Sequence, residues 1–216
     1  MMKCIFFSLF LACTQFVHAN DSLTFVFLHK KTDNTPISKE ETDRIMNGHM
    51  ANIQKMAAEG KLIVAGPFEG GGGIFIFKTG SIAKVKDWLK NDPGIIAKRW
   101  NEEYLPISFT YGKACIAKEP YEMVTYNFIR FTLDQTKFNV QQAPHTLSNH
   151  DLYLKKLIET GNVVAVASFG KQEGGILIMK GELDMRVPEA SPAVQEQLLI
   201  PAAKKLWVAK GSFCEN

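Results

Sequence analysis

The chain has 216 residues, with 25 Lys and Arg against 22 Asp and Glu, so its formal net charge is only +3. This near balance, without a basic run interleaved with aromatic residues, argues against a nucleic-acid partner. Apolar residues make up 46% of a chain that is long enough for two small domains. We therefore expect a folded protein whose partner is a small molecule.

The first 19 residues are expected to be a secretory signal peptide. A basic start, an apolar run from Cys4 to Cys13 and the small-residue pattern Val17-His18-Ala19 follow the usual order of a signal sequence. The apolar run is too short to span a bilayer, so no membrane segment would remain after cleavage. A lipoprotein site at Leu11-Ala12-Cys13 is the alternative. With cleavage after Ala19, we expect the mature protein to be secreted or periplasmic.

A pattern that begins at His49 is repeated 101 residues later at His150. Residues 49–68 align without a gap with residues 150–169, and apolar positions match between Leu62–Ala65 and Val163–Val166. A period this long indicates duplicated domains rather than a solenoid of short repeats. We expect a first domain at residues 21–115 and a second, degenerate domain at residues 121–214.

The first repeat begins with an expected strand and a capped helix. Thr24–His29 is rich in β-branched and aromatic residues, which favours a buried strand. At the same offset of 101 residues, this strand aligns with a strand that begins at Thr125. Ser38 and Glu41 form a capping box that predicts the start of a helix. Gly60 predicts its end.

The remaining elements of this repeat complete the order β-α-β-β-α-β. Strands are expected at Leu62–Ala65 and Ile74–Phe77, a helix after Ser81, a short helix at Asp92-Pro93, and a closing strand at Ile107–Tyr111. This order predicts an α+β protein with a ferredoxin-like fold, and two such sheets commonly close into an α+β barrel. The second repeat can then take the place of a dimer partner, which predicts an internal pseudo-dimer. The sequence leaves open whether two molecules associate further.

The first repeat resembles the YciI-like (YCII-related) family of dimeric α+β barrel proteins. The resemblance rests on a helix histidine, His49, a glycine that ends the helix, Gly60, the turn Ala65-Gly66-Pro67 and the dipeptide Asp92-Pro93. The arginine often found one turn before the family histidine is absent, because Met46 occupies that place. The resemblance implies a tandem fusion of two family domains.

The second repeat resembles the family more weakly. It keeps His150 and Gly161, but it has Ala167-Ser168 in place of Gly-Pro and Ser191 in place of the aspartate. The resemblance therefore implies a complete histidine-aspartate pair in the first repeat only. The second repeat is expected to serve as a scaffold.

The resemblance implies that His49 and Asp92 are the catalytic pair, and the best-defined relative removes chloride from a chlorinated hydroxyquinol. An aspartate bonded to one imidazole nitrogen fixes the tautomer, so the other nitrogen can take a proton. Each residue also has a structural interpretation: His49 lies on an apolar helical stripe, and Asp92 before proline is typical of a helix N-cap. His150, Gly66 and Pro67 are expected to contact the ligand.

Two functions follow from these residues. The first is a cofactor-free lyase or isomerase acting on a small molecule, and the alternative is a non-catalytic module that binds a small ligand. No cofactor or metal is expected, because the sequence contains no GxGxxG, GK[ST], HExxH or CxxC pattern, and no GxSxG elbow indicates a serine hydrolase. Cys115 and Cys214, at equivalent ends of the repeats, form either a disulfide or two free thiols.

Overall fold

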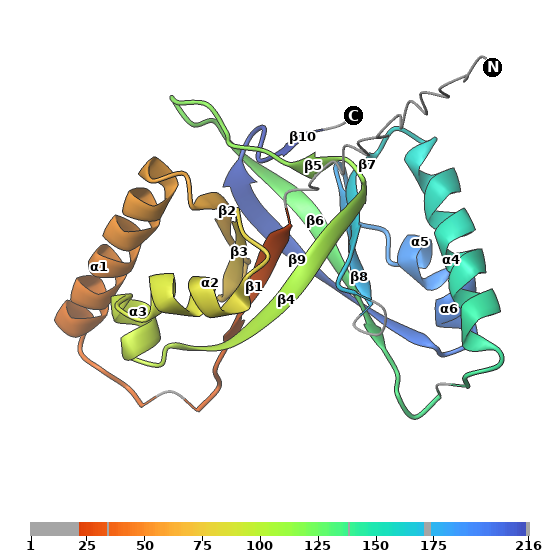
Figure 1. Ribbon diagram of the computed structural model, residues 1–216, viewed down its shortest axis with the longest axis horizontal. Helices are drawn as coiled ribbons and strands as arrows, with labels where there is room; N and C mark the ends of the chain where they lie inside the picture. The colour runs from red at the N-terminus through yellow and green to blue at the C-terminus, as the bar shows by residue number, and fades with distance from the viewer. Residues whose placement is uncertain (1–21, 34, 138, 171–173, 215–216) are drawn as a thin grey trace, which may run out of the picture.

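The computed structural model describes residues 22–33, 35–137, 139–170 and 174–214. The expected signal peptide, residues 1–19, lies outside these ranges. No helix within them has the length and apolar character needed to cross a membrane. Two groups of helices flank a central set of strands, with α1–α3 on one side and α4–α6 on the other (Figure 1).

The first repeat has the expected order of elements. Ser38 caps α1 through a 3.1 Å hydrogen bond from the Glu41 N–H, and Gly60, at φ 66°, follows the end of the helix. The closing strand is longer than Ile107–Tyr111, because it pairs with the whole of β1. The elements are β1 (Leu23–Lys30), α1 (Lys39–Ala58), β2 (Leu62–Pro67), β3 (Gly73–Phe77), α2 (Ile82–Leu89), α3 (Pro93–Ile96), β4 (Trp100–Tyr111) and β5 (Lys113–Ala114).

The second repeat follows the same order, but the long second helix of the first repeat is replaced by one turn. Pro188 lies within this turn and has no backbone N–H to extend a helix. The elements are β6 (Met123–Leu133), α4 (Ala143–Ile158), β7 (Val163–Ser168), β8 (Gly175–Met179), α5 (Arg186–Glu189), α6 (Pro192–Gln195), β9 (Leu199–Ala209) and β10 (Phe213–Cys214).

Eight of the strands form one antiparallel sheet in the order β2-β3-β1-β4-β7-β8-β6-β9. Each half has the strand order of a ferredoxin-like fold, and β4 joins β7 at the first junction. At the opposite junction, the Glu69 N–H donates to the Lys205 carbonyl at 2.9 Å, and Phe68 forms a bridge with Leu206. The sheet therefore closes on itself, which confirms the expected α+β barrel made by two repeats.

The interior of the barrel is an apolar cluster to which both repeats contribute. Five buried phenylalanines pack there with ring centroids between 4.5 and 6.2 Å apart. Burying an aromatic ring of this size is worth about 1.5–3 kcal/mol, so this shared core holds the repeats together. The rings belong to Phe25, Phe27, Phe68, Phe128 and Phe169.

An ion pair also joins the repeats. The two terminal nitrogens of Arg130 on β6 each donate to a carboxylate oxygen of Glu103 on β4, at 2.7 Å. The guanidinium lies 4.4 Å from the ring centroid of Phe27, and His29 Nε2 lies 2.6 Å from Glu103. The hydrogen bonds from Arg130 hold the pKa of Glu103 below its ordinary value. The pair fixes β6 against β4 where the barrel interior becomes polar.

The registers of the sheet correct the alignment of the first strands. Thr24 lies opposite Phe77, and Asn127 lies opposite Met179. Both polar side chains are buried. Each donates a hydrogen bond to a backbone carbonyl two residues after the end of the neighbouring strand, β3 for Thr24 and β8 for Asn127. Asn127 therefore occupies the place of Thr24, and the alignment of Thr24 with Thr125 is wrong by two residues.

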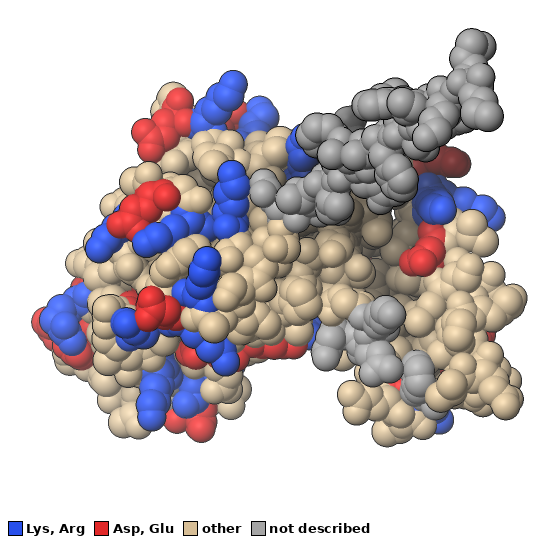
Figure 2. Space-filling model, viewed as in Figure 1, with Lys and Arg blue, Asp and Glu red and all other residues tan. Residues whose placement is uncertain are grey.

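Charged side chains are dispersed on the face of the molecule shown in Figure 2. Over the side formed by α1 and α2, basic and acidic groups alternate rather than gather by sign. This view therefore gives no indication of a nucleic-acid surface.

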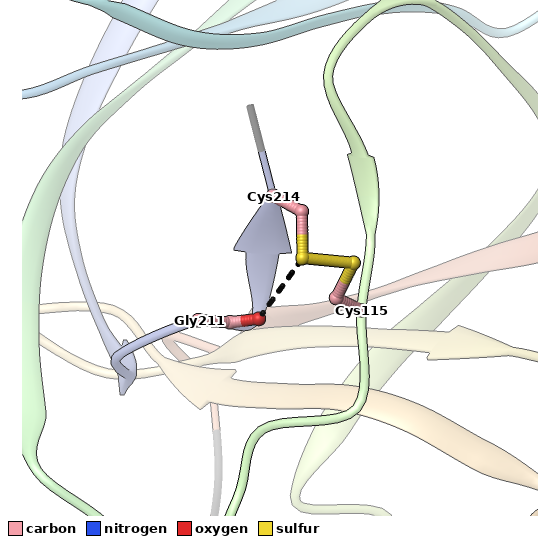
Figure 3. The surroundings of a disulfide bond; sticks show 3 residues. All are labelled: Cys115, Gly211 and Cys214. Carbon is pink, nitrogen blue, oxygen red and sulfur yellow. Dashed lines mark hydrogen bonds between the residues drawn. A yellow bond between two sulfur atoms is a disulfide. The ribbon is translucent and has the colours of Figure 1, made fainter. Parts of the chain in front are cut away.

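A disulfide joins Cys115 to Cys214, which answers the question that the sequence left open. Figure 3 shows the bond beside the last strand, where the Cys214 sulfur also lies 3.7 Å from the Gly211 carbonyl. Next to it, the short strands β5 and β10 pair with each other. The ends of the two repeats are therefore tied together covalently.

We predict that removing this bond lowers the free energy of unfolding. The two cysteines are 99 residues apart, so the bond restricts a long loop in the unfolded chain, and its loss should cost about 2–5 kcal/mol. Urea unfolding of a Cys115→Ser/Cys214→Ser variant measures the change. Wild type treated with a reductant should match the variant, and equal stability of oxidised and reduced wild type would contradict the prediction.

Candidate functional site

His49 and Asp92 are in direct contact. His49 comes from the middle of α1 and Asp92 from the residue that caps α3. The Nδ1 atom of His49 lies 2.9 Å from each carboxylate oxygen of Asp92. The two groups are 5% and 0% exposed. The structure therefore brings together the residues that the sequence singled out, in a geometry that allows a hydrogen bond.

Asp92 is a buried carboxylate with several donors around it. Asn52 donates from its side chain at 2.9 Å, and the N–H groups of Gly94 and Ile95 donate at 2.9 and 3.2 Å. Burial raises the pKa of Asp92, but the hydrogen bonds from His49, Asn52 and Ile95 outweigh it, so the pKa lies below its ordinary value.

An ionised carboxylate only accepts hydrogen bonds, so the contact requires a proton on Nδ1 of His49. In the neutral ring the lone pair is then on Nε2. The histidine is therefore fixed in the tautomer that suits a general base. Nδ1 is occupied by Asp92, which leaves Nε2 as the nitrogen that can react.

Two glycines allow α3 to approach α1 and β4. A Cβ on Gly48 would lie 2.7 Å from the Pro93 ring, and one on Gly94 would lie 2.4 Å from the Trp100 ring. The Trp100 ring centroid is 4.8 Å from that of His49. This close packing holds the start of α3, and with it Asp92, against the histidine.

His49 lies in the wall of a cavity of about 560 Å³ between α1 and the strands of the first repeat. Gly66 and Pro67 also line it, and most of the remaining wall is apolar. Such a cavity has the size and composition of a small-molecule site.

Charge is distributed unevenly around this cavity. Lys30, Lys31 and Arg99 line it, and its lining includes no Asp or Glu among the described residues. Lys31 lies 3.9 Å from Asp33, outside the lining. Cations around an apolar space raise the local concentration of anions. The site is therefore suited to a ligand that carries negative charge.

His150 lies in a separate, smaller cavity of about 190 Å³ in the second repeat. Its Nδ1 atom lies 2.6 Å from the Ser191 hydroxyl, and Ser191 makes no capping hydrogen bond. Burial lowers the pKa of His150, against the smaller effect of Asp151. A neutral hydroxyl can donate or accept, so this contact does not fix the tautomer.

The described lining of the second cavity has no counterpart of the cations of the first. In the corrected alignment, Leu133 stands where the first repeat has Lys30, and Leu198 stands where it has Arg99. The described lining of the second cavity includes Asp151 and no Lys or Arg. The structure thus brings His49, Asp92, Gly66 and Pro67 together and places His150 elsewhere.

Sequence reasoning missed an asparagine, two tryptophans and two basic side chains around His49. Asn52 lies three positions after His49, which is a helical spacing that could have been noticed. Trp100, Lys30 and Trp207 are brought to the site by the packing of strands, and Arg99 lies in the connection between α3 and β4. As for metals, the part of the chain that the structure describes contains no group of three or more His, Cys, Asp or Glu that could hold an ion.

The fold and the site define a class of protein. A closed barrel of two ferredoxin-like repeats, with a histidine-aspartate pair beside a cavity, is an α+β barrel of the dimeric type fused into one chain. Residues 23–103 match the model of the YCII-related domain family. This match confirms the resemblance, and it includes both His49 and Asp92. No curated protein matches the chain.

Solved structures that are similar to this chain have low sequence identity to it. A candidate chlorite dismutase is 11% identical over 88% of this chain and 95% of its own, with a TM-score of 0.51. A candidate monooxygenase from Lactobacillus acidophilus is 9% identical over 90% of this chain and 95% of its own, with a TM-score of 0.43. A heme-binding protein from Thermus thermophilus is 8% identical over 88% of this chain and 90% of its own, with a TM-score of 0.43. At these identities, the chlorite dismutase comparison supports the barrel fold alone.

We predict that Asp92 makes the stability of the protein sensitive to acid. Because the pKa of Asp92 is lowered on folding, its contribution is fully present above the ordinary value of 3.8 and is lost as pH falls through the folded value. An Asp92→Asn variant should be less stable at neutral pH by about 1–3 kcal/mol and should lose less stability in acid. Denaturant unfolding between about pH 6 and about pH 2 measures both effects. Parallel pH curves for the two proteins would contradict the prediction.

Proposed function

We propose that the protein is an exported, cofactor-free enzyme that transfers a proton on a small molecule bound in the cavity beside His49. The observation that carries this proposal is the fixed tautomer of His49, whose Nδ1 is held by a buried carboxylate while its ring lines the cavity. A lyase or isomerase step requires little more than a positioned base and a site for the developing negative charge.

His49 would act as the general base. Its Nε2 atom would take a proton from an activated C–H or a phenol O–H of the substrate. The imidazolium that forms would be stabilised by Asp92, which is already ionised and hydrogen-bonded. Returning the proton to another atom completes an isomerisation, and loss of a leaving group completes an elimination.

Lys30, Lys31 and Arg99 would stabilise the negative charge that develops on the substrate. They lie in the lining of the same cavity as His49, where their positive charge attracts an anion. This arrangement separates the roles: the histidine moves the proton and the basic groups hold the anion.

Export is supported by two features of the chain. The first 19 residues have the order of a signal peptide, and Cys115 and Cys214 form a disulfide. Disulfides persist in oxidising compartments and are rare in the cytosol. We therefore propose a secreted or periplasmic location.

The second candidate function is a non-catalytic module that binds a small ligand. It is favoured by the 5% exposure of His49 and by the apolar character of most of the cavity wall. The two candidates differ in whether the histidine reacts, so a measurement of proton transfer separates them.

The test is exchange of substrate protons with solvent. Wild-type protein is incubated in D₂O with a panel of small ketoacids, lactones and phenols, and ¹H NMR follows exchange, isomerisation or release of a leaving group. His49→Gln and Asp92→Asn should each lower the rate on an active compound by about 10²–10⁴-fold. The matched variant His150→Gln, in the other cavity, should retain the wild-type rate.

Binding of a panel compound without any proton exchange by wild type would favour the non-catalytic module. Equal loss of rate in His49→Gln and His150→Gln would contradict the assignment of the first cavity.

A further inference from the structure

The wall of the first cavity is completed by the second repeat. Met123 on β6 and Trp207 on β9 line the cavity that contains His49. Trp207 is 51% exposed, which is unusual for a side chain with so large an apolar surface. Its neighbours Leu206 and Val208 are fully buried in the barrel, so the alternation of the strand directs Trp207 to the opposite face.

A glycine brings β9 to the cavity. A Cβ on Gly66 would lie 2.6 Å from the Trp207 carbonyl oxygen and 2.3 Å from a methyl carbon of Val208. Only a residue without a side chain allows this approach, and Gly66 itself lines the cavity. Trp207 is thus carried to the rim of the site by the junction that closes the barrel.

We infer that the site takes a planar aromatic carboxylate, whose ring packs against Trp207 and whose charge faces Lys30, Lys31 and Arg99. An indole offers a broad flat surface for an aromatic ring, and such contacts add about 0.5–1.5 kcal/mol beyond burial. The unbranched side chains of Met46, Met50 and Met123 adapt to the ring edge. The inference rests on the proposed site and names its ligand class.

The second cavity provides an internal comparison. Two junctions join the repeats in the barrel. Trp207 lies beside the junction where Phe68 pairs with Leu206, and Ser108 holds the equivalent position at the junction of β4 with β7. Leu133 and Leu198 replace two of the cations. The features that we assign to recognition of an aromatic acid are therefore absent together from the described lining of the second cavity, where Ser191 also replaces the aspartate.

The test uses 2-naphthoate and its neutral counterpart 2-naphthamide, which have nearly the same shape. NMR titration at low salt follows the indole signals of Trp100 and Trp207. Wild type should bind naphthoate at least about tenfold more tightly than naphthamide, because only the acid interacts with the cations.

Substitutions then separate the two contacts. Trp207→Ala should weaken binding of both compounds by about fivefold, and Trp207→Phe should recover part of this loss because it restores a ring. Lys30→Ala should weaken naphthoate alone by about fivefold. Ile200→Ala, an equally exposed apolar residue of β9, and Lys84→Ala, an exposed cation of α2, are the matched controls and should bind as wild type does.

Equal affinity for acid and amide, no binding of naphthoate by wild type, or the same result for Trp207→Ala and Ile200→Ala would overturn the inference. Failure of the proposed function has a different signature. His49→Gln should still bind naphthoate, so the binding pattern can hold even if the proton-exchange experiment shows no reaction.

Discussion

The carboxylate of Asp92 is the interaction on which the site depends. It caps α3, accepts from Asn52 and fixes the ring of His49, all while excluded from solvent. A buried carboxylate is tolerated only when its oxygens are hydrogen-bonded, so these contacts stabilise one another. The second repeat shows what its loss means: Ser191 still contacts His150, but it makes no capping bond and carries no charge. One side chain thus links the stability of a helix start to the orientation of a base.

Fusion of two repeats in one barrel explains how the two halves could come to differ. A symmetric dimer must place the same residues at both cavities, whereas a fused chain can change each half separately. Here the barrel interior is shared, the Arg130–Glu103 pair and the disulfide tie the halves together, and the two cavities have different charges. The second repeat has lost the aspartate, yet it supplies Trp207 to the site of the first. Its role in our account is to support and complete a site that it does not itself contain.

The local features of this protein could be predicted from sequence because they depend on neighbouring residues. The Ser38 cap, the end of α1 at Gly60 and the start of α3 after Asp92 are set by short-range hydrogen bonds and backbone conformation. The register of β6 could not be predicted, since a shift of two residues leaves every side chain on the same face of the strand and preserves the apolar pattern. Lys30 and Trp207 reach the cavity through strand pairing and barrel closure, which no local pattern records.

The most direct test of the account is the tautomer of His49, measured by ¹⁵N NMR of the imidazole nitrogens near neutral pH. We predict a protonated Nδ1 and, in the neutral ring, an unprotonated Nε2 in wild type. In Asp92→Asn, whose amide can donate as well as accept, this preference should be lost or reversed. His150 should show the same signals in both proteins. An unchanged His49 tautomer in the variant would contradict the claim that Asp92 sets the chemistry of the site.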